Sequence, residues 1–216
     1  MIAYCEVLDA PFLVIETPAR YTLDQEEVDR ARDFFSSINF RDIRLVWELR
    51  APISSAVINL MQDFNIVHCV DLSMGKPSFH SNIVYSRLFG KGRHNIYQFT
   101  DEELVEIDRN SQSSHKVIAL SYHGVRMHTD AIRFMQYKKT DRFMPATGFT
   151  GVNSVRAVLH EDAEFPSSKY KLIEEQGWKV VDLSVEKRVH LSELLSDIPD
   201  KTYKSIGEVT EELKIK

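Results

Sequence analysis

The sequence predicts an α/β protein with about five parallel strands, followed by a small helical domain. Short apolar runs alternate with amphipathic stretches over the first two thirds of the chain, which is the pattern of βαβ units and a parallel sheet. Residues 145–151 then contain two glycines and a proline, and helical patterns follow them. We therefore expect a domain over residues 1–144, a linker over 145–151 and a small all-α domain over 152–216.

The expected strands are nearly continuous apolar runs, as in a parallel sheet that helices cover. They are residues 11–16, 44–50, 66–72, 83–89 and 116–122. Capping patterns and apolar stripes predict the helices between them. Beyond the linker, helices are expected over residues 154–160, 168–176, 189–196 and 206–213. Trp178 is expected to pack between these helices, and His190 is expected to be a packing residue and not a site residue.

Composition excludes several classes of protein. The 216 residues carry a formal charge of -5 and 43% are hydrophobic, so the chain is globular and is not built for bulk binding of nucleic acid, although a local basic patch could still bind it. No apolar run reaches the ~18 residues of a membrane span, and the first residues lack the basic region of a secretory signal. Two distant cysteines, one of them Cys69 in an apolar run, favour a reducing compartment, so we expect a cytoplasmic protein.

Several sequence pieces occur together in a known order and spacing. They are VWELR at 46–50, VD at 70–71, YSRLFG at 85–90, Tyr97 and TDEEL at 100–104. In these pieces the stretch from about residue 10 to 131 resembles the YecE-like family, domain of unknown function 72, whose fold is a (β/α)-barrel. That family normally begins with about three more strands. The resemblance therefore implies an incomplete TIM-type (β/α) barrel that contains only strands 4–8.

The C-terminal region resembles a second family. The pieces are Phe165-Pro166, Lys169, Leu172, Ile198-Pro199, Tyr203, Ser205, Glu208-Val209 and Leu213. They are similar to the family called domain of unknown function 2795. Neither resemblance implies an established activity, cofactor or metal for this chain.

Polar residues end the expected strands on one face. Side chains alternate across a strand, so every second residue points to the same side. The residues on that side are Glu16, Glu48 with Arg50, Asp71, Arg87 and His123. In barrel enzymes the site lies at the C-terminal ends of the strands. We expect Glu48, Asp71 and His123 as catalytic candidates and Glu16, Arg50 and Arg87 as ligand-binding residues, or else an internal ion-pair network with His123 in a hydrogen-bonded turn.

The loop after the fourth expected strand has the composition of an anion site. Gly90 and Gly92 allow backbone N–H groups to approach an anion, and Lys91 and Arg93 add positive charge. With Tyr97, these residues complete the predicted ligand-binding set. The alternative is a solvated basic turn. Glu48, Asp71 and His123 could also ligate a metal, but no His or Cys pair with ligand spacing supports it, so the metal and cofactor stay unknown.

Two functions are compatible with these patterns. The first is a barrel-derived subunit that binds a phosphorylated or nucleic-acid-derived ligand at the rim of the strands, with hydrolase-type acid/base chemistry. The second is a non-catalytic binding or assembly protein that acts through the helical domain. Because about five strands cannot close a barrel, both outer strands would be open edges. We therefore expect a partner chain that supplies the missing strands, or a homodimer.

Overall fold

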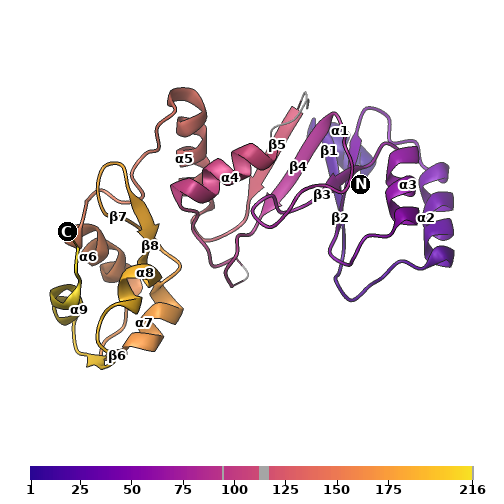
Figure 1. The fold of residues 1–216 in the computed structure, drawn as a ribbon. Coiled ribbons are helices and arrows are strands. Elements are labelled where there is room, and N and C mark those ends of the chain that lie inside the picture. The colour runs from indigo at the N-terminus through magenta and orange to yellow at the C-terminus, as the bar shows by residue number, and fades with distance from the viewer. Residues whose placement is uncertain (94, 112–116, 216) are drawn as a thin grey trace. The chain divides into compact units, whose positions relative to one another are not determined.

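The computed structural model describes residues 1–93, 95–111 and 117–215 (Figure 1). The chain divides into two compact units. Unit 1 comprises Met1–Leu88 and Arg109–Ser121, and unit 2 comprises Phe89–Asp108 and Tyr122–Lys216. No helix among the described residues is long and apolar enough to cross a membrane.

Unit 1 is built around a short parallel sheet. Its elements are α1 (Ile2–Val7), β1 (Phe12–Thr17), α2 (Gln25–Ser37), β2 (Arg44–Leu49), α3 (Ser55–Asp63), β3 (Val67–Cys69), β4 (Ile83–Leu88) and most of β5 (Val117–Tyr122). The strands β1, β2 and β3 form one parallel sheet in that order, with Val46 opposite both Val14 and Val67. Strands β4 and β5 form a second, two-stranded sheet.

The prediction of a five-stranded incomplete barrel is therefore wrong, because the strands form two separate sheets. The break falls between β3 and β4, where a single parallel bridge joins Val70 to Ser86. The Ser86 hydroxyl donates to Val70 O at 2.8 Å and accepts from Leu72 N at 3.1 Å. The Ser86 side chain thus takes the place of the next backbone hydrogen bond between the two strands, and the backbone pairing does not continue from β3 to β4.

Helices cover one face of the β1–β3 sheet, as the alternation of side chains predicts. Leu45, Trp47 and Leu49 pack against residues of α2 and α3, including Phe35 and Leu60. Figure 1 shows these two helices beside the strands. An Asp24 side chain that accepts from Glu27 N begins α2, and Ser54 caps α3 in the same way. This cluster is an apolar core of unit 1 and holds the helices against the sheet.

The opposite face of the strands is narrow and curved. Val46, Val67 and Cys69 form its buried centre. The rings of Phe12 in β1 and Tyr85 in β4 pack edge to face, with centroids 5.3 Å apart. Neighbouring strands of a sheet lie about 4.8 Å apart, so a flat arrangement in which β4 followed β3 at that spacing would separate β1 from β4 by ~14 Å. The strands therefore curl toward this face, which brings the carboxyl ends of β1, β2 and β4 together.

Unit 2 contains the remaining elements. They are most of α4 (Asp101–Ser111), α5 (Met127–Thr140), α6 (Val152–Asp162), β6 (Ser167–Ser168), α7 (Lys169–Gln176), β7 (Val180–Asp182), β8 (Arg188–His190), α8 (Leu191–Ser196), β9 (Thr202–Tyr203) and α9 (Ile206–Glu212). The prediction of an all-α region is wrong here, because β6 pairs with β9 and β7 pairs with β8, both antiparallel. The hairpin β7–β8 includes Val189, which the sequence assigned to a helix.

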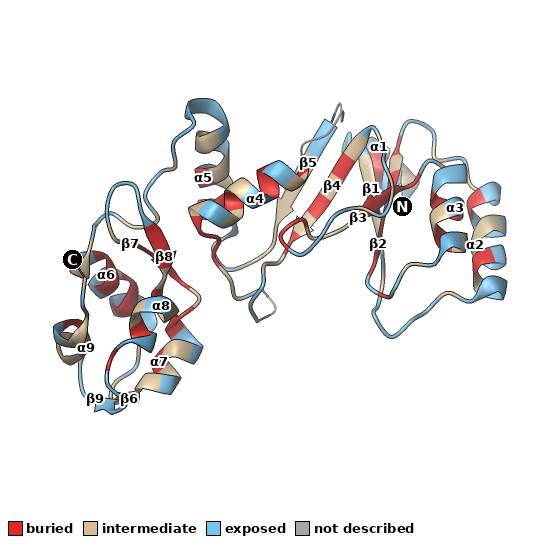
Figure 2. Cartoon of the chain, in the orientation of Figure 1, coloured by how far each residue is buried: buried red, intermediate tan, exposed pale blue. Residues whose placement is uncertain are grey.

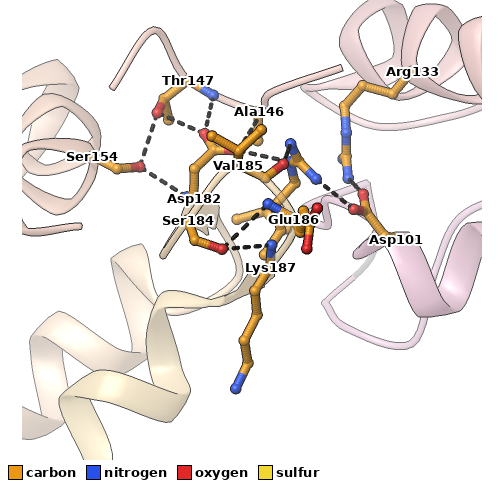
Figure 3. A network of polar contacts seen from close by, with 12 residues as sticks. Asp101, Arg133, Ala146, Thr147, Ser154, Asp182, Ser184, Val185, Glu186 and Lys187 are labelled. Atoms are coloured by element: carbon orange, nitrogen blue, oxygen red, sulfur yellow. Dashed lines mark hydrogen bonds and ion pairs between the residues drawn. The ribbon is translucent and has the colours of Figure 1, made fainter. Parts of the chain in front are cut away.

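A chain of buried charges runs through unit 2 (Figure 3). Arg133 contacts Asp130 at 3.0 Å and Asp101 at 2.6 Å, and Arg188 contacts Asp101 at 2.6 Å and Asp182 at 2.7 Å. Asp182 also accepts hydrogen bonds from the backbone of residues 146 and 147. Acidic and basic groups alternate along this chain, so each buried charge has a partner of opposite sign. The chain joins α4, α5 and the β7–β8 hairpin.

Candidate functional site

Four of the predicted rim residues meet at the carboxyl ends of β1, β2 and β4. Arg50 donates to Glu48 from Nε at 2.7 Å and pairs with Glu16 through Nη2 at 2.9 Å. Arg87 Nη1 lies 2.5 Å from Glu16 Oε2 and also contacts Glu48 Oε2. The four side chains form a closed ring in which carboxylates and guanidinium groups alternate.

This ring favours the structural interpretation of the rim. It contains two negative and two positive groups, and each group has two partners within it. Burial disfavours the charge on Arg87, but its hydrogen bonds to Glu16 and Glu48 outweigh burial and raise its pKa. A guanidinium group that already holds two carboxylates has little capacity left for an anionic ligand.

Asp71 and Cys69, two polar residues of the third expected strand, have surroundings of a different kind. Asp71 Oδ1 accepts from the backbone N of Ser73 at 2.9 Å and from its hydroxyl at 2.6 Å, so this carboxylate orders the turn after β3. Cys69 is 1% exposed. Burial, followed by the nearby charge of Glu48, raises the pKa of the Cys69 thiol to about 12. The thiol is therefore protonated and unreactive near neutral pH.

The three predicted catalytic residues belong to different units. Glu48 and Asp71 lie in unit 1, whereas His123 lies in unit 2, where its ring stacks on Phe89 with centroids 4.8 Å apart. Over the described ranges, no group of three or more His, Cys, Asp or Glu side chains could hold a metal ion. The catalytic roles of these residues stay a prediction.

The glycines of the 90–93 loop make room for the ring of Tyr97. Gly90 has a φ of 83°, and a Cβ there would lie 2.2 Å from Tyr97 Cδ1. A Cβ on Gly92 would lie 2.7 Å from Cδ2 of the same ring. The Tyr97 hydroxyl donates to Glu103, and burial together with this bond raises its pKa. Lys91 lies 3.6 Å from Glu103, so the first cation of the loop has a carboxylate partner.

Unit 2 has a groove of about 720 Å³ beside this loop. Gly92, Arg93 and Tyr97, three members of the predicted ligand-binding set, line it. The last residues of α7 and Trp178 also line it. Small-molecule sites have volumes of about 300–1,000 Å³ and combine apolar surface with a few fixed polar groups. The groove fits both criteria.

Two side chains in the groove are held firmly. His190 Nε2 lies 2.8 Å from Gln98 O, and its ring centroid lies 5.1 Å from that of Tyr97. Gln98 also accepts from Val180 N through its side chain at 2.9 Å. These bonds fix the start of α4 and the β7–β8 hairpin against each other. The Tyr97 and His190 rings are therefore preorganised for contact with a ligand.

Carboxylates dominate the charged lining of the groove. Asp162, Glu164, Glu174 and Glu175 line it, against the guanidinium group of Arg93. Burial would raise the pKa of Asp162, but a hydrogen bond from Lys179 lowers it overall, so this carboxylate is ionised at neutral pH. Lys171 similarly lies 3.4 Å from Glu164 and 3.7 Å from Glu175. Glu174 makes no ion pair with any part of the chain that the structure describes.

Sequence reasoning missed most of this groove. It assigned Trp178 and His190 to packing and proposed no site in the helix 168–176. The helix expected over residues 168–176 agrees with α7 to within one residue, but its N-cap is Ser168, which accepts from Lys171 N, and not Ser167 as the sequence pattern indicated. No local pattern could show that the end of this helix faces a loop about 80 residues earlier.

No protein-family model, no curated protein and no solved structure matches this chain. The two family resemblances therefore stay proposals.

Proposed function

We propose that this chain is a non-catalytic binding protein whose ligand occupies the groove of unit 2. The observation that carries the proposal is a groove of ligand size with a rigid aromatic lining, formed by Tyr97 and His190. The rim of unit 1 supports the same conclusion. Its acidic and basic side chains bind each other, so they provide no free acid/base pair.

The charge of the groove favours a ligand with an ammonium or guanidinium group. Lys171 and Lys179 offset part of the negative charge, but Glu174 stays exposed and unpaired within the described chain. Gln176 adds a buried acceptor, Oε1, that has no donor in the described structure. Acceptors and carboxylates stabilise a cationic donor, and the ring of Trp178 can contact it through a cation–π interaction.

A titration with spermidine tests this proposal, and a parallel titration with inorganic phosphate tests the alternative that the groove binds an anion. We expect spermidine to bind and Glu174→Lys to weaken it roughly tenfold, the effect of removing ~1.4 kcal/mol of attraction. Glu186→Lys is the matched control, since Glu186 is exposed and lies outside the groove lining. Calorimetry measures both. A response to phosphate that Arg93→Ala abolishes would favour the anion site that the loop sequence predicts.

Hydrolase chemistry at the rim is the alternative, because four predicted residues do converge there. It requires a substrate to open the ion-pair ring. Glu48→Gln would then abolish hydrolysis of a phosphoester panel. We expect no such hydrolysis from the wild-type chain.

A further inference from the structure

The strand β5 is an open and apolar sheet edge. Among the described residues it pairs with β4 and with no second strand. Val117 and Ile118 expose 44% and 46% of their surface, and Figure 2 colours the start of β5 as exposed. Successive side chains of a strand point to opposite faces, so this end of β5 is uncovered on both faces. The other outer strand of unit 1, β1, contains the charged Glu16 next to its last residue, and α1 packs against it.

The direction of the backbone groups identifies which residues are available for pairing. Val117 N donates to Asn82 O, just before β4, at 3.3 Å. Because backbone groups alternate along a strand, those of Ile118, Leu120 and Tyr122 point away from β4. Natural edge strands are usually blunted by lysine, proline or a bulge. Val117–Tyr122 contains no charged residue and no proline.

We propose that β5 pairs antiparallel with β5 of a second copy of this chain. A two-fold axis must place one residue opposite its own copy, and only Leu120 at the centre uses all three outward-pointing residues. Leu120 then faces Leu120 of the partner, and Ile118 faces the partner's Tyr122 on both sides of the axis.

A second copy fits this edge better than a separate chain that would supply the missing strands of a barrel. The five-stranded barrel that would require such strands is not formed. An uncharged strand places no like charges opposite itself and offers no charge for a different partner to recognise. Pairing would extend the β4–β5 sheet to four strands and cover the exposed Val117 and Ile118.

Sedimentation equilibrium of the full chain at micromolar concentrations tests the proposal. We expect a dimer, and Ile118→Lys should raise its dissociation constant by roughly tenfold or more. The two-fold symmetry makes each cross-strand pair occur twice, so one substitution removes two pairs. Val185→Lys is the control, since Val185 is 78% exposed in unit 2. It should dimerise like the wild type. A wild-type monomer, or an Ile118→Lys dimer of unchanged affinity, would overturn the proposal.

Cross-linking decides the register even if Ile118→Lys fails to fold. In a Leu120→Cys variant the two thiols should react across the axis with a short bismaleimide, whereas Val185→Cys should give no dimer. Absence of the Leu120→Cys cross-link in a folded dimer would also overturn the proposed pairing.

Discussion

Arg133→Met tests whether the buried ion pairs hold unit 2 together. Arg133 is 1% exposed and donates to Asp130 at 3.0 Å, to Asp101 at 2.6 Å and to Phe99 O at 2.6 Å. Methionine is apolar and offers no donor, so the Asp130 carboxyl loses its guanidinium partner and must either stay charged while buried or take up a proton. Removing one partner of a buried pair costs about 3–5 kcal/mol. We expect that loss in the free energy of unfolding of unit 2 at pH 7.

A second substitution separates the cost of leaving the Asp130 carboxyl without its partner from the cost of the other contacts that Arg133 loses. Asp130→Asn on the Arg133→Met background removes the buried charge, while the asparagine carbonyl can still accept from Phe99 N. Asp101 keeps its pair with Arg188. We expect the double variant to recover most of the loss and to lie within ~2 kcal/mol of the wild type, since apolar replacement of a whole buried pair is often neutral.

Urea unfolding followed by tryptophan fluorescence measures these changes. The chain has two tryptophans, Trp47 in unit 1 and Trp178 in unit 2. A Trp47→Phe background leaves one reporter, so the midpoint and slope describe unit 2. A loss below about 1 kcal/mol for Arg133→Met would refute the reasoning, because a buried pair should cost several times more. So would a double variant no more stable than the single one.

Three further predictions follow from individual side chains. Burial raises the pKa of Asp130 to about 6 from 3.8, so the folded state binds this proton more tightly than the unfolded chain. The free energy of unfolding of unit 2 should therefore fall by at most about 3 kcal/mol as pH rises from about 4 to 6. Asp130→Asn should remove this pH dependence in urea titrations. Gly90→Ala should cost about 1–3 kcal/mol by thermal unfolding because of its positive φ and the adjacent ring, whereas Gly148→Ala, with open space around it, should be nearly neutral. Glu48→Gln should destabilise unit 1 by about 1–3 kcal/mol, and an equal effect from Glu26→Gln, which removes an exposed i,i+4 pair, would contradict this.

Features with a local periodic signal could be predicted from the sequence. The alternation of Leu45, Val46 and Trp47 correctly assigned the faces of β2, because a strand has a fixed period of two. The same alternation placed Glu48 and Arg87 on one face, where the structure joins them. Their convergence was predictable, but their mutual neutralisation depends on side-chain geometry that no spacing encodes.

The errors concern features that depend on contacts between distant segments. The sheet ends between β3 and β4, where the Ser86 hydroxyl bonds to the backbone of Val70 and Leu72. A serine within an apolar run does not predict such a bond. The strands β6 and β9 have two residues each, too few for a period to be visible. A helical pattern was therefore the stronger local signal across the C-terminal region.

The glycine loop shows how one pattern can serve two purposes. Glycines beside Lys91 and Arg93 predict an anion site, since the two glycines would allow the backbone N–H groups to approach an anion closely. In the structure Gly90 and Gly92 allow the approach of the Tyr97 ring instead. The sequence located a loop that lines the groove, but the remainder of that groove comes from α7 and β8, which only the fold brings beside it.

The indole N–H resonances of the two tryptophans test the proposed groove most directly. Trp178 lines the groove and donates to Glu175 O, whereas Trp47 donates to Thr17 in unit 1 and serves as an internal reference. In a nitrogen-15 NMR titration with spermidine at constant ionic strength, we expect the Trp178 signal to shift saturably and the Trp47 signal to stay in place. An unmoved Trp178 signal, or equal shifts of both signals, would contradict a cation-binding groove in unit 2.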